Sequence, residues 1–180
     1  MILAEFSAPW SRTLRVTTAG TAALLLAIAL GGSLIGPRHL LVWRFVVVIL
    51  PALILLAALP FAVMGYLLRE EVIEVRRLGW RTRLPLDGLI EVTGEPEGLR
   101  GAVRLLGNGG LFAFNGWFWS RRLGRFHAYA TDPERVVLLR YRDGRKVVLT
   151  PGDVQHFIVR VRTQLQVRAG HATRRPYGST

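Results

Sequence analysis

The stretch LVWRFVVVILPALILLAALPFAVMGYLL, residues 41–68, decides the fold of this 180-residue chain. Its only charged residue is Arg44, and as a helix its 28 residues would extend about 42 Å, against a bilayer hydrocarbon core of about 30 Å. The core helix of a soluble protein seldom stays apolar on all sides over that length. Pro51 and Pro60 are tolerated in a membrane helix. We therefore expect this stretch to cross a membrane.

A second apolar run, residues 16–36, lies just before it and matches one bilayer crossing. Arg12 and Arg15 precede this run, and a basic start followed by an apolar run is also typical of a signal peptide. The run is longer than a usual signal peptide, however, and no clear cleavage site follows. Because only a short turn at Gly36–His39 separates the two runs, we predict a transmembrane helical hairpin over residues 16–68, with helices at about 16–36 and 41–68.

The distribution of arginines predicts the orientation of the hairpin. Arg38 and Arg44 lie near the link, whereas the outer ends carry Arg12, Arg15, Arg69, Arg76, Arg77, Arg81 and Arg83. Cytoplasmic loops carry an excess of basic residues. Both termini and the part of the chain after the hairpin are therefore expected on the cytoplasmic side of a membrane that the chain crosses twice.

Residues 69–167 predict a small, mainly β domain. The hydrophobic period changes from helical to alternating after Leu68, and the expected strands are 71–78, 80–86, 89–92, 102–106, 125–131, 135–141 and 146–150. Asp143-Gly144 is a strong hairpin signal between the last two. A closing helix is predicted from five apolar residues at helical spacing, Val154, Phe157, Ile158, Val161 and Leu165. The pattern favours a barrel of about six or seven antiparallel strands capped by a C-terminal helix, followed by a disordered basic tail, residues 168–180.

Residues 1–15 form a separate N-terminal segment. Met1–Phe6 alternates loosely, and two interpretations stay open: a short strand or a frayed end. If it is a strand that pairs into the sheet, the membrane hairpin is an insertion within the domain.

Over residues 70–165 the chain resembles the bacterial PH-domain family. The segments that carry the resemblance are Val75–Gly79, Leu84–Ile90, Gly107–Phe112, Gly116, Leu123–Gly124, Ala128–Thr131, Val136–Leu139, Thr150–Asp153 and Phe157. The resemblance implies a pleckstrin-homology-like (PH-like) fold, no known catalytic residues and a mostly unknown function. Together with the predicted hairpin and its arginines, it leads us to expect the protein in a bacterial cytoplasmic (inner) membrane. The resemblance does not imply a phosphoinositide site, because there is no compact Lys/Arg signature and Lys146 is the only lysine.

The most unusual segment is GNGGLFAFNGWFWSRRLG, residues 107–124, in which five large aromatic residues lie among five glycines. In one interpretation the aromatics fill the core and the glycines form bulges and turns. In the other, an exposed aromatic loop contacts the bilayer interface or a partner protein. The glycines favour no phosphate loop, since no lysine or serine follows at the required spacing. The candidate interaction residues are Phe112, Phe114, Trp117, Phe118, Trp119, Arg121 and Arg122.

Four arginines close to the predicted membrane, Arg76, Arg77, Arg81 and Arg83, are candidate lipid-facing residues. Each would contribute about 1 kcal/mol against an anionic membrane surface. The alternative is that they only set the membrane orientation.

Enzyme chemistry is not predicted. The four histidines lack metal-ligand spacing, the chain has no cysteine, and no nucleophile or carboxylate pair stands out. We expect no catalytic residue, cofactor or metal. The net charge of +12 comes without a nucleic-acid-binding motif, so no nucleic acid is expected.

The expected function is a membrane-anchored PH-like module that binds or scaffolds a membrane-associated protein partner. The alternative is a module that senses anionic lipids through its arginines.

Overall fold

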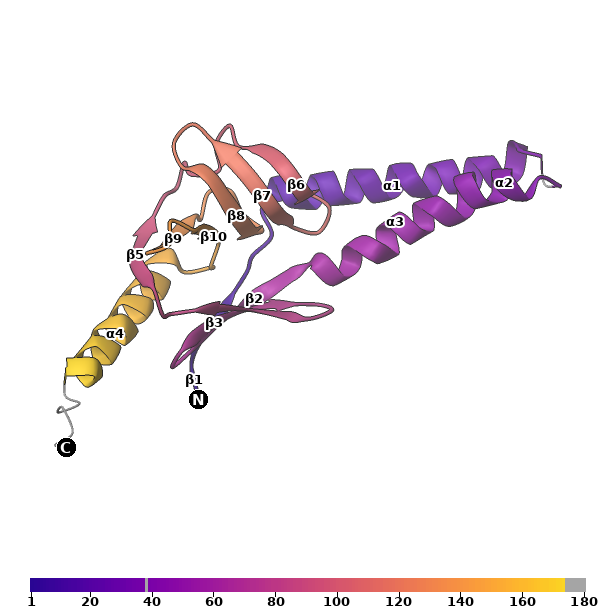
Figure 1. The fold of residues 1–180 in the computed structure, drawn as a ribbon. Coiled ribbons are helices and arrows are strands. Elements are labelled where there is room, and N and C mark those ends of the chain that lie inside the picture. Colours follow the sequence, from indigo (N-terminus) through magenta and orange to yellow (C-terminus); the bar gives the residue numbers. More distant parts are fainter. Residues whose placement is uncertain (38, 174–180) are drawn as a thin grey trace.

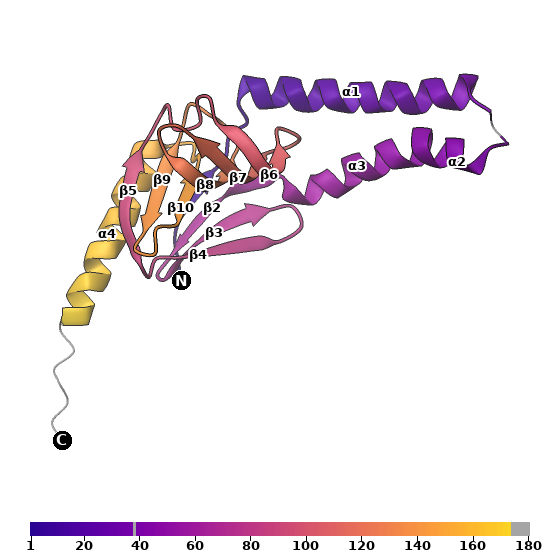
Figure 2. The same ribbon diagram turned by 45° about the horizontal axis from the view of Figure 1, so that its top comes forward.

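The computed structural model describes residues 1–37 and 39–173. Two long helices project side by side from a β-rich body, and helix α4 (Val154–Thr173) lies on the far side of that body (Figures 1 and 2). The first long helix is α1 (Arg12–Ile35). The second consists of α2 (Leu41–Arg44), a π-helical turn (Phe45–Ile49), α3 (Leu50–Ala58) and a 3₁₀ turn (Leu59–Phe61).

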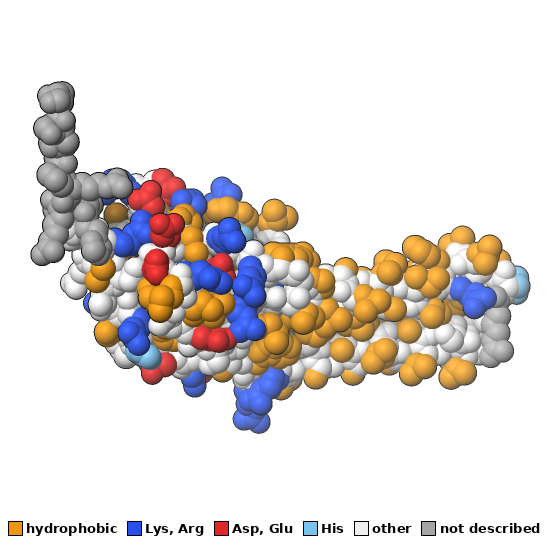
Figure 3. Space-filling view, turned by 90° about the horizontal axis from the view of Figure 1, so that it is seen from below, with side chains coloured by type: hydrophobic (Ala, Val, Ile, Leu, Met, Phe, Trp, Pro, Cys, Tyr) orange, Lys and Arg blue, Asp and Glu red, His pale blue; other side chains and the backbone are white. Residues whose placement is uncertain are grey.

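Both projecting helices, Arg12–Ile35 and Leu41–Phe61, are long and apolar enough to cross a membrane. Their apolar side chains face outward along the length of the projection, while charged side chains gather on the β-rich body (Figure 3). The first two turns of α1 are an exception, because Leu14 and Thr18 are buried against the body. The two predicted apolar helices are therefore present, and α1 begins four residues earlier than expected.

The helix predicted for residues 41–68 is wrong beyond Phe61. The end of the apolar stretch forms strand β2 (Val63–Arg69), in which Tyr66, Leu67 and Leu68 are all buried. A strand buried on both faces has no alternation of polar and apolar residues. Its sequence is then indistinguishable from the end of an apolar helix.

The ten strands of the described chain form two open sheets. The first sheet has the order β1-β2-β3-β4 and adds β1 (Ile2–Ser7), β3 (Val72–Arg77) and β4 (Arg81–Pro85) to β2. The second has the order β5-β9-β10-β8-β7-β6 and comprises β5 (Leu89–Gly94), β6 (Val103–Gly109), β7 (Phe114–Ser120), β8 (Gly124–Ala130), β9 (Val137–Tyr141) and β10 (Lys146–Leu149).

The prediction of a closed, wholly antiparallel barrel of six or seven strands needs three corrections. The sheets are open, and strands β1, β2 and β7 add to the seven expected ones. Strands β8 and β10 pair in parallel. The parallel pair follows from the path of the chain: β9 runs opposite to β8 with a gap of one strand between them, and β10 turns back at Asp143-Gly144 to fill that gap.

The main core lies between the two sheets and is closed by α4. Phe157 and Val161 of α4 are fully buried against it, and the predicted apolar face of this helix is confirmed. Tyr66 ties the layers together, since its hydroxyl donates to the carbonyl of Tyr129 (2.6 Å) and accepts from the amide of Thr150 (3.1 Å). Burial raises the Tyr66 pKa to about 12, so the hydroxyl stays protonated.

A second apolar cluster, centred on Phe118, Phe126 and Leu138, covers the outer face of the six-stranded sheet. At the C-terminal end, α4 continues through residues 168–173, which were predicted to be disordered. The rest of that predicted tail, residues 174–180, lies outside the described residues.

The N-terminal segment joins the sheet, and the interpretation of Met1–Phe6 as a strand is confirmed. Strand β1 pairs antiparallel with β2, with Phe6 opposite Tyr66. The helical hairpin is thus inserted between two neighbouring strands of one sheet. The link from β1 to α1 is also fixed: the hydroxyl of Thr131 donates to the carbonyl of Pro9 (2.8 Å), and the Ser11 side chain caps α1.

The packing of β1 predicts the effect of truncating Phe6. Its ring is 5% exposed and meets Phe157 edge to face at 5.0 Å. Phe6→Ala should lower the free energy of unfolding by about 3 kcal/mol, or the melting temperature in detergent by roughly 6–12 °C. Ile2→Ala, in the same strand but 52% exposed, is the control and should change stability by less than about 0.5 kcal/mol. Equal melting temperatures for the two variants would contradict the pairing of β1.

Candidate functional site

The aromatic segment at residues 107–124 forms the β6–β7 hairpin and its following turn. Its aromatic residues separate by environment. Phe118 is buried in the outer cluster, and Phe114 packs against that cluster. Phe112, at the hairpin tip, meets Trp10 edge to face at 6.2 Å. Trp119 is 43% exposed, and Trp117 lines a cleft described below. The segment is therefore neither wholly core nor a single exposed loop.

The two arginines that follow lie in the β7–β8 turn. Arg122 forms salt bridges with Glu95 (2.9 Å) and Glu97 (3.7 Å). Arg121 is exposed. These ion pairs connect the turn to the loop after β5. The Arg122 side chain is therefore engaged within the domain, whereas it was predicted to contact a partner.

Two glycines of the segment allow β6 and β7 to approach closely. Gly107 and Gly116 are opposite each other in the pairing, both with positive φ. A Cβ at Gly107 would lie 2.3 Å from the carbonyl oxygen of Asn115, and one at Gly116 would lie 2.2 Å from that of Leu106. The glycines also leave a patch of bare backbone on the wall of the cleft.

Three of the four candidate lipid-facing arginines have carboxylate partners. Arg81 and Arg83 lie 3.5 and 3.7 Å from Glu74, which is only 3% exposed. Arg76 pairs with Glu5 of β1. Arg77 differs from the other three, because no ion pair is found for it among the described residues.

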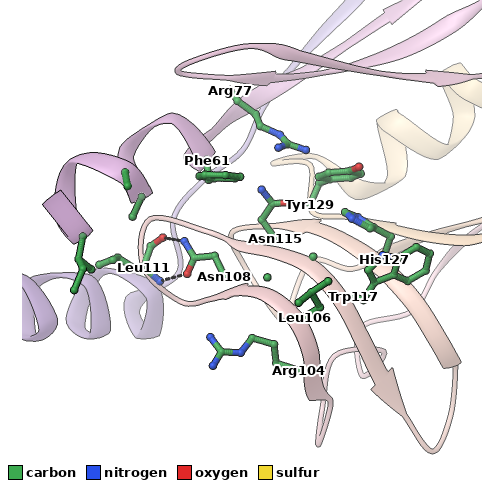
Figure 4. Close-up of a pocket in the computed structure, with 15 residues that line it drawn as sticks. Phe61, Arg77, Arg104, Leu106, Asn108, Leu111, Asn115, Trp117, His127 and Tyr129 are labelled. Carbon is green, nitrogen blue, oxygen red and sulfur yellow. Dashed lines mark hydrogen bonds between the residues drawn. The ribbon is translucent and has the colours of Figure 1, made fainter.

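Arg77 points into a cleft of about 670 Å³ where the projecting helices join the β-rich body (Figure 4). The end of the second helix, with Ile54, Ala57, Ala58 and Phe61, forms one wall. The opposite wall comes from β6, β7 and β8, and its lining includes Leu106, Asn115, Trp117, His127 and Tyr129. The two sheets enclose the main core at the α4 end, and the cleft occupies the space between them at the helix end.

The polar groups of the cleft lie among aromatic rings. The Arg77 guanidinium is 4.7 Å from the centre of the Tyr129 ring and 5.2 Å from that of Trp80. The His127 ring meets Trp117 edge to face at 5.0 Å and lies 4.4 Å from Tyr129. These contacts hold the cation and the imidazole in fixed positions.

Burial shifts the pKa of Arg77, His127 and Tyr129 in the direction that favours the neutral form of each side chain. Burial, with a smaller contribution from Arg77, lowers the His127 pKa to about 4, so the imidazole is neutral at pH 7. Burial also lowers the Arg77 pKa and raises that of Tyr129. Two buried nitrogens, Nε of Arg77 and Nδ1 of His127, have no hydrogen-bond partner in the part of the chain that the structure describes. The cleft is thus suited to a ligand that carries negative charge or hydrogen-bonding oxygens.

The open edge of β6 is a second candidate surface. Val103, Leu105 and Leu106 of β6 are 57%, 55% and 70% exposed, and Trp119 lies beside Val103 on β7. We call these four residues the β6 edge surface. The other edge of this sheet is covered, because Arg162 of α4 donates two hydrogen bonds to the Val92 carbonyl of β5. The β4 edge is short and carries Arg81, Arg83 and Pro85, features that discourage strand pairing.

Most of the residues that line the cleft were not predicted from the sequence. Of the predicted candidate residues only Arg77 and Trp117 lie there, and they came from two separate groups. His127 and Tyr129 could have been found from their alternation with Phe126 and Ala128 on β8, which places both on one face. Phe61 could not, because it was assigned to the interior of a longer helix. Among the described residues, no group of three or more His, Asp or Glu is arranged to hold a metal ion.

Two open sheets, packed around a core and closed at one end by a C-terminal helix, define a PH-like module. Residues 64–165, more than half of the chain, match the family model for the bacterial PH domain. The chain therefore belongs to the bacterial PH domain family. The match runs from β2 into α4, and leaves β1 and the projecting helices outside it. No curated protein and no solved structure matches the chain.

The depressed pKa of His127 predicts how stability depends on pH. Its folded pKa of about 4 is below the ordinary value of 6.5, so the unfolded state takes up a proton first as the pH falls. The contribution of His127 is fully present above pH 6.5 and is lost as the pH approaches 4. Between these values the wild type should lose about 1–2 kcal/mol more stability than His127→Gln, after allowance for partial exposure. Melting temperatures of both proteins across this pH range measure the difference, and parallel curves would contradict it.

Proposed function

We propose that this protein is a non-catalytic, membrane-anchored PH-like module that binds and scaffolds a membrane-associated protein partner through the β6 edge surface. The observation that carries the proposal is an unpaired strand edge with three exposed apolar side chains in a fold whose β4 and β5 edges are protected. Soluble domains usually blunt such an edge, because it would otherwise pair with other chains. An edge left open and apolar favours a binding role by strand addition.

The insertion of the hairpin between β1 and β2 supports the anchoring part of the proposal. Each helix joins its strand through a short link, four residues (8–11) before α1 and one residue, Ala62, after the second helix. The domain is therefore held at a fixed height and tilt beside the membrane. Restricting a binding domain in this way raises its effective concentration for a partner in the same membrane.

The chemistry of the β6 edge surface suggests the chemistry of the partner. Main-chain groups along β6 would pair with an extended segment, and the exposed Val103 and Leu105 would contact apolar side chains on it. Arg104 on the same strand is exposed, as is Arg125 of β8, which stacks on Trp117 at 4.4 Å. An extended segment with apolar and acidic residues would complement this surface in shape and charge.

The alternative, lipid sensing by Arg76, Arg77, Arg81 and Arg83, has less support. Two carboxylates, Glu5 and Glu74, already pair with three of these arginines, which reduces the positive charge available to a lipid surface. Binding through arginines would weaken steeply with salt, whereas binding through the apolar β6 edge surface would not.

Photo-crosslinking from β6 tests the proposed binding role. A photoreactive phenylalanine at position 105 of the full-length protein, in native membranes, should give a discrete protein adduct in both low and high salt. Adding Val103→Lys should lower the adduct yield by about tenfold or more, because it places a charge in the apolar interface. The matched control is position 90: Ile90 is 60% exposed on the covered β5 edge and should give no such adduct. The same adducts from both positions, or none from position 105, would refute the role of β6.

We further propose that both termini and the domain face the cytoplasm, on the basis of the arginine distribution. Because the chain has no cysteine, single cysteines can report the orientation. His39→Cys, in the link between the helices, should react with a membrane-impermeant maleimide added outside intact cells. Asp143→Cys, in the β9–β10 turn, should react only after the cells are opened. Labelling of Asp143→Cys in intact cells would contradict this proposal and show that the domain faces outward.

A further inference from the structure

The cleft combines two kinds of wall that rarely meet in a soluble binding site. Ile54, Ala57 and Phe61 belong to a helix that is long and apolar enough to cross a membrane. Ile54 lies seven residues before Phe61, so this wall extends about 10 Å along the helix. The headgroup layer of one leaflet is roughly 5–8 Å thick. On the proposed membrane anchoring, on which this inference rests, a cleft of this depth at the end of the helix would reach from the headgroup layer to the edge of the hydrocarbon core.

Strand β3 supplies an incompletely satisfied cation to the cleft. Arg77 is held between Tyr129 and Trp80, without a carboxylate partner among the described residues, and its Nε has no hydrogen-bond partner there. Asn115 is 6% exposed and lies beside Arg77 and Tyr129 in the cleft (Figure 4). The neighbouring Nδ1 of His127 is also buried without a partner. Cationic and polar groups that are buried in this way are normally paired, so their arrangement points to an anion with several oxygens.

We propose that this cleft binds one anionic amphiphile, with its phosphate or other oxyanion at Arg77 and its apolar chain along Ile54, Ala57 and Phe61. The guanidinium suits an oxyanion because its N–H groups donate in a fixed plane. The bare backbone at Gly107 and Gly116 leaves room for the ligand between the walls. The amphiphile would come from the surrounding membrane leaflet and would enter the cleft between the second helix and the β-rich body.

An amphiphile fits the cleft better than a free anion. The lining is mainly apolar side chains, including Leu106, Leu111 and Trp117, whereas an inorganic phosphate would contact only the polar part of the lining, around Arg77 or Arg104. A free anion would also leave the α3 wall without a partner. Leu106 and Arg104 belong to both surfaces, but the lipid proposal is tested at Arg77 and Ala57 and the β6 strand-addition role at Val103 and Leu105, so each can fail without the other.

Binding of phosphatidylglycerol tests the inference. The full-length protein in a neutral detergent is titrated with this anionic lipid and, separately, with phosphatidylcholine, and bound lipid is counted by native mass spectrometry. We expect saturation at one phosphatidylglycerol per chain and much weaker binding of phosphatidylcholine. Arg77→Gln should weaken phosphatidylglycerol binding by about tenfold or more, since a charge-assisted hydrogen bond is lost. The matched control is Arg83→Gln, which removes an equal charge nearby and should change the affinity by less than about twofold.

A second variant separates an amphiphile from a free anion. Ala57→Phe fills the apolar wall from an exposed helix position. This variant should reduce phosphatidylglycerol binding because it occupies the space of the lipid chain, while the Arg77 guanidinium that would bind the oxyanion is unchanged. Inorganic phosphate is the competing probe: if millimolar phosphate binds at Arg77 and Ala57→Phe does not affect lipid binding, the site takes a free anion and the proposal is wrong. Equal lipid binding by the wild type and Arg77→Gln, with unchanged melting temperatures, would also overturn it.

Discussion

The pairing of β1 with β2 is the constraint on which the rest of the structure depends. Neighbouring strands are about 4.8 Å apart, and packed helices are about 8–10 Å apart, so two helices that leave adjacent strands are already close to packing distance. The register places Phe6 opposite Tyr66, and Tyr66 in turn bonds across to Tyr129 and Thr150 of the second sheet. One strand pair thus links the hairpin, the first sheet and the second sheet.

This constraint makes the two ends of the β-rich body different. At one end α4 inserts Phe157 and Val161 between the sheets and completes the main core. At the other end the place of a closing element is taken by the end of the second helix, which packs Phe61 against Trp80 at 4.9 Å but does not fill the space between the sheets. The space that this helix leaves unfilled between the two sheets is the cleft. Its position beside the two long apolar helices follows from the connectivity, because the helices and the open end share the same strands.

Much of this architecture could be predicted from the sequence, and the errors have a common physical cause. Alternation of apolar and polar residues revealed β3 and β5, and helical spacing revealed α4. The Asp143-Gly144 turn revealed β10, although Val147, Val148 and Leu149 are all buried. Strand β2 lies between two neighbouring strands with nearly every side chain buried, so it resembles a membrane helix in sequence. Strand β7 alternates between the outer face of the sheet, at Phe118, and the inner face, at Trp117 and Trp119, and both faces carry aromatic residues. Where both faces of a strand are apolar, hydrophobic periodicity contains no signal.

The arginines show why composition alone could not define the site. Four of them lie close together in the sequence, but their partners depend on pairing between distant strands: Glu5 of β1 comes next to Arg76 only because β2 carries β1 alongside β3. Glu74 draws in Arg69, Arg81 and Arg83 within the same sheet. The one arginine that faces away from these carboxylates is Arg77, which reaches Tyr129 of the other sheet. A net charge of +12 therefore says little about which arginine is left without a carboxylate partner, which depends on the pairing of the strands and the contact between the two sheets.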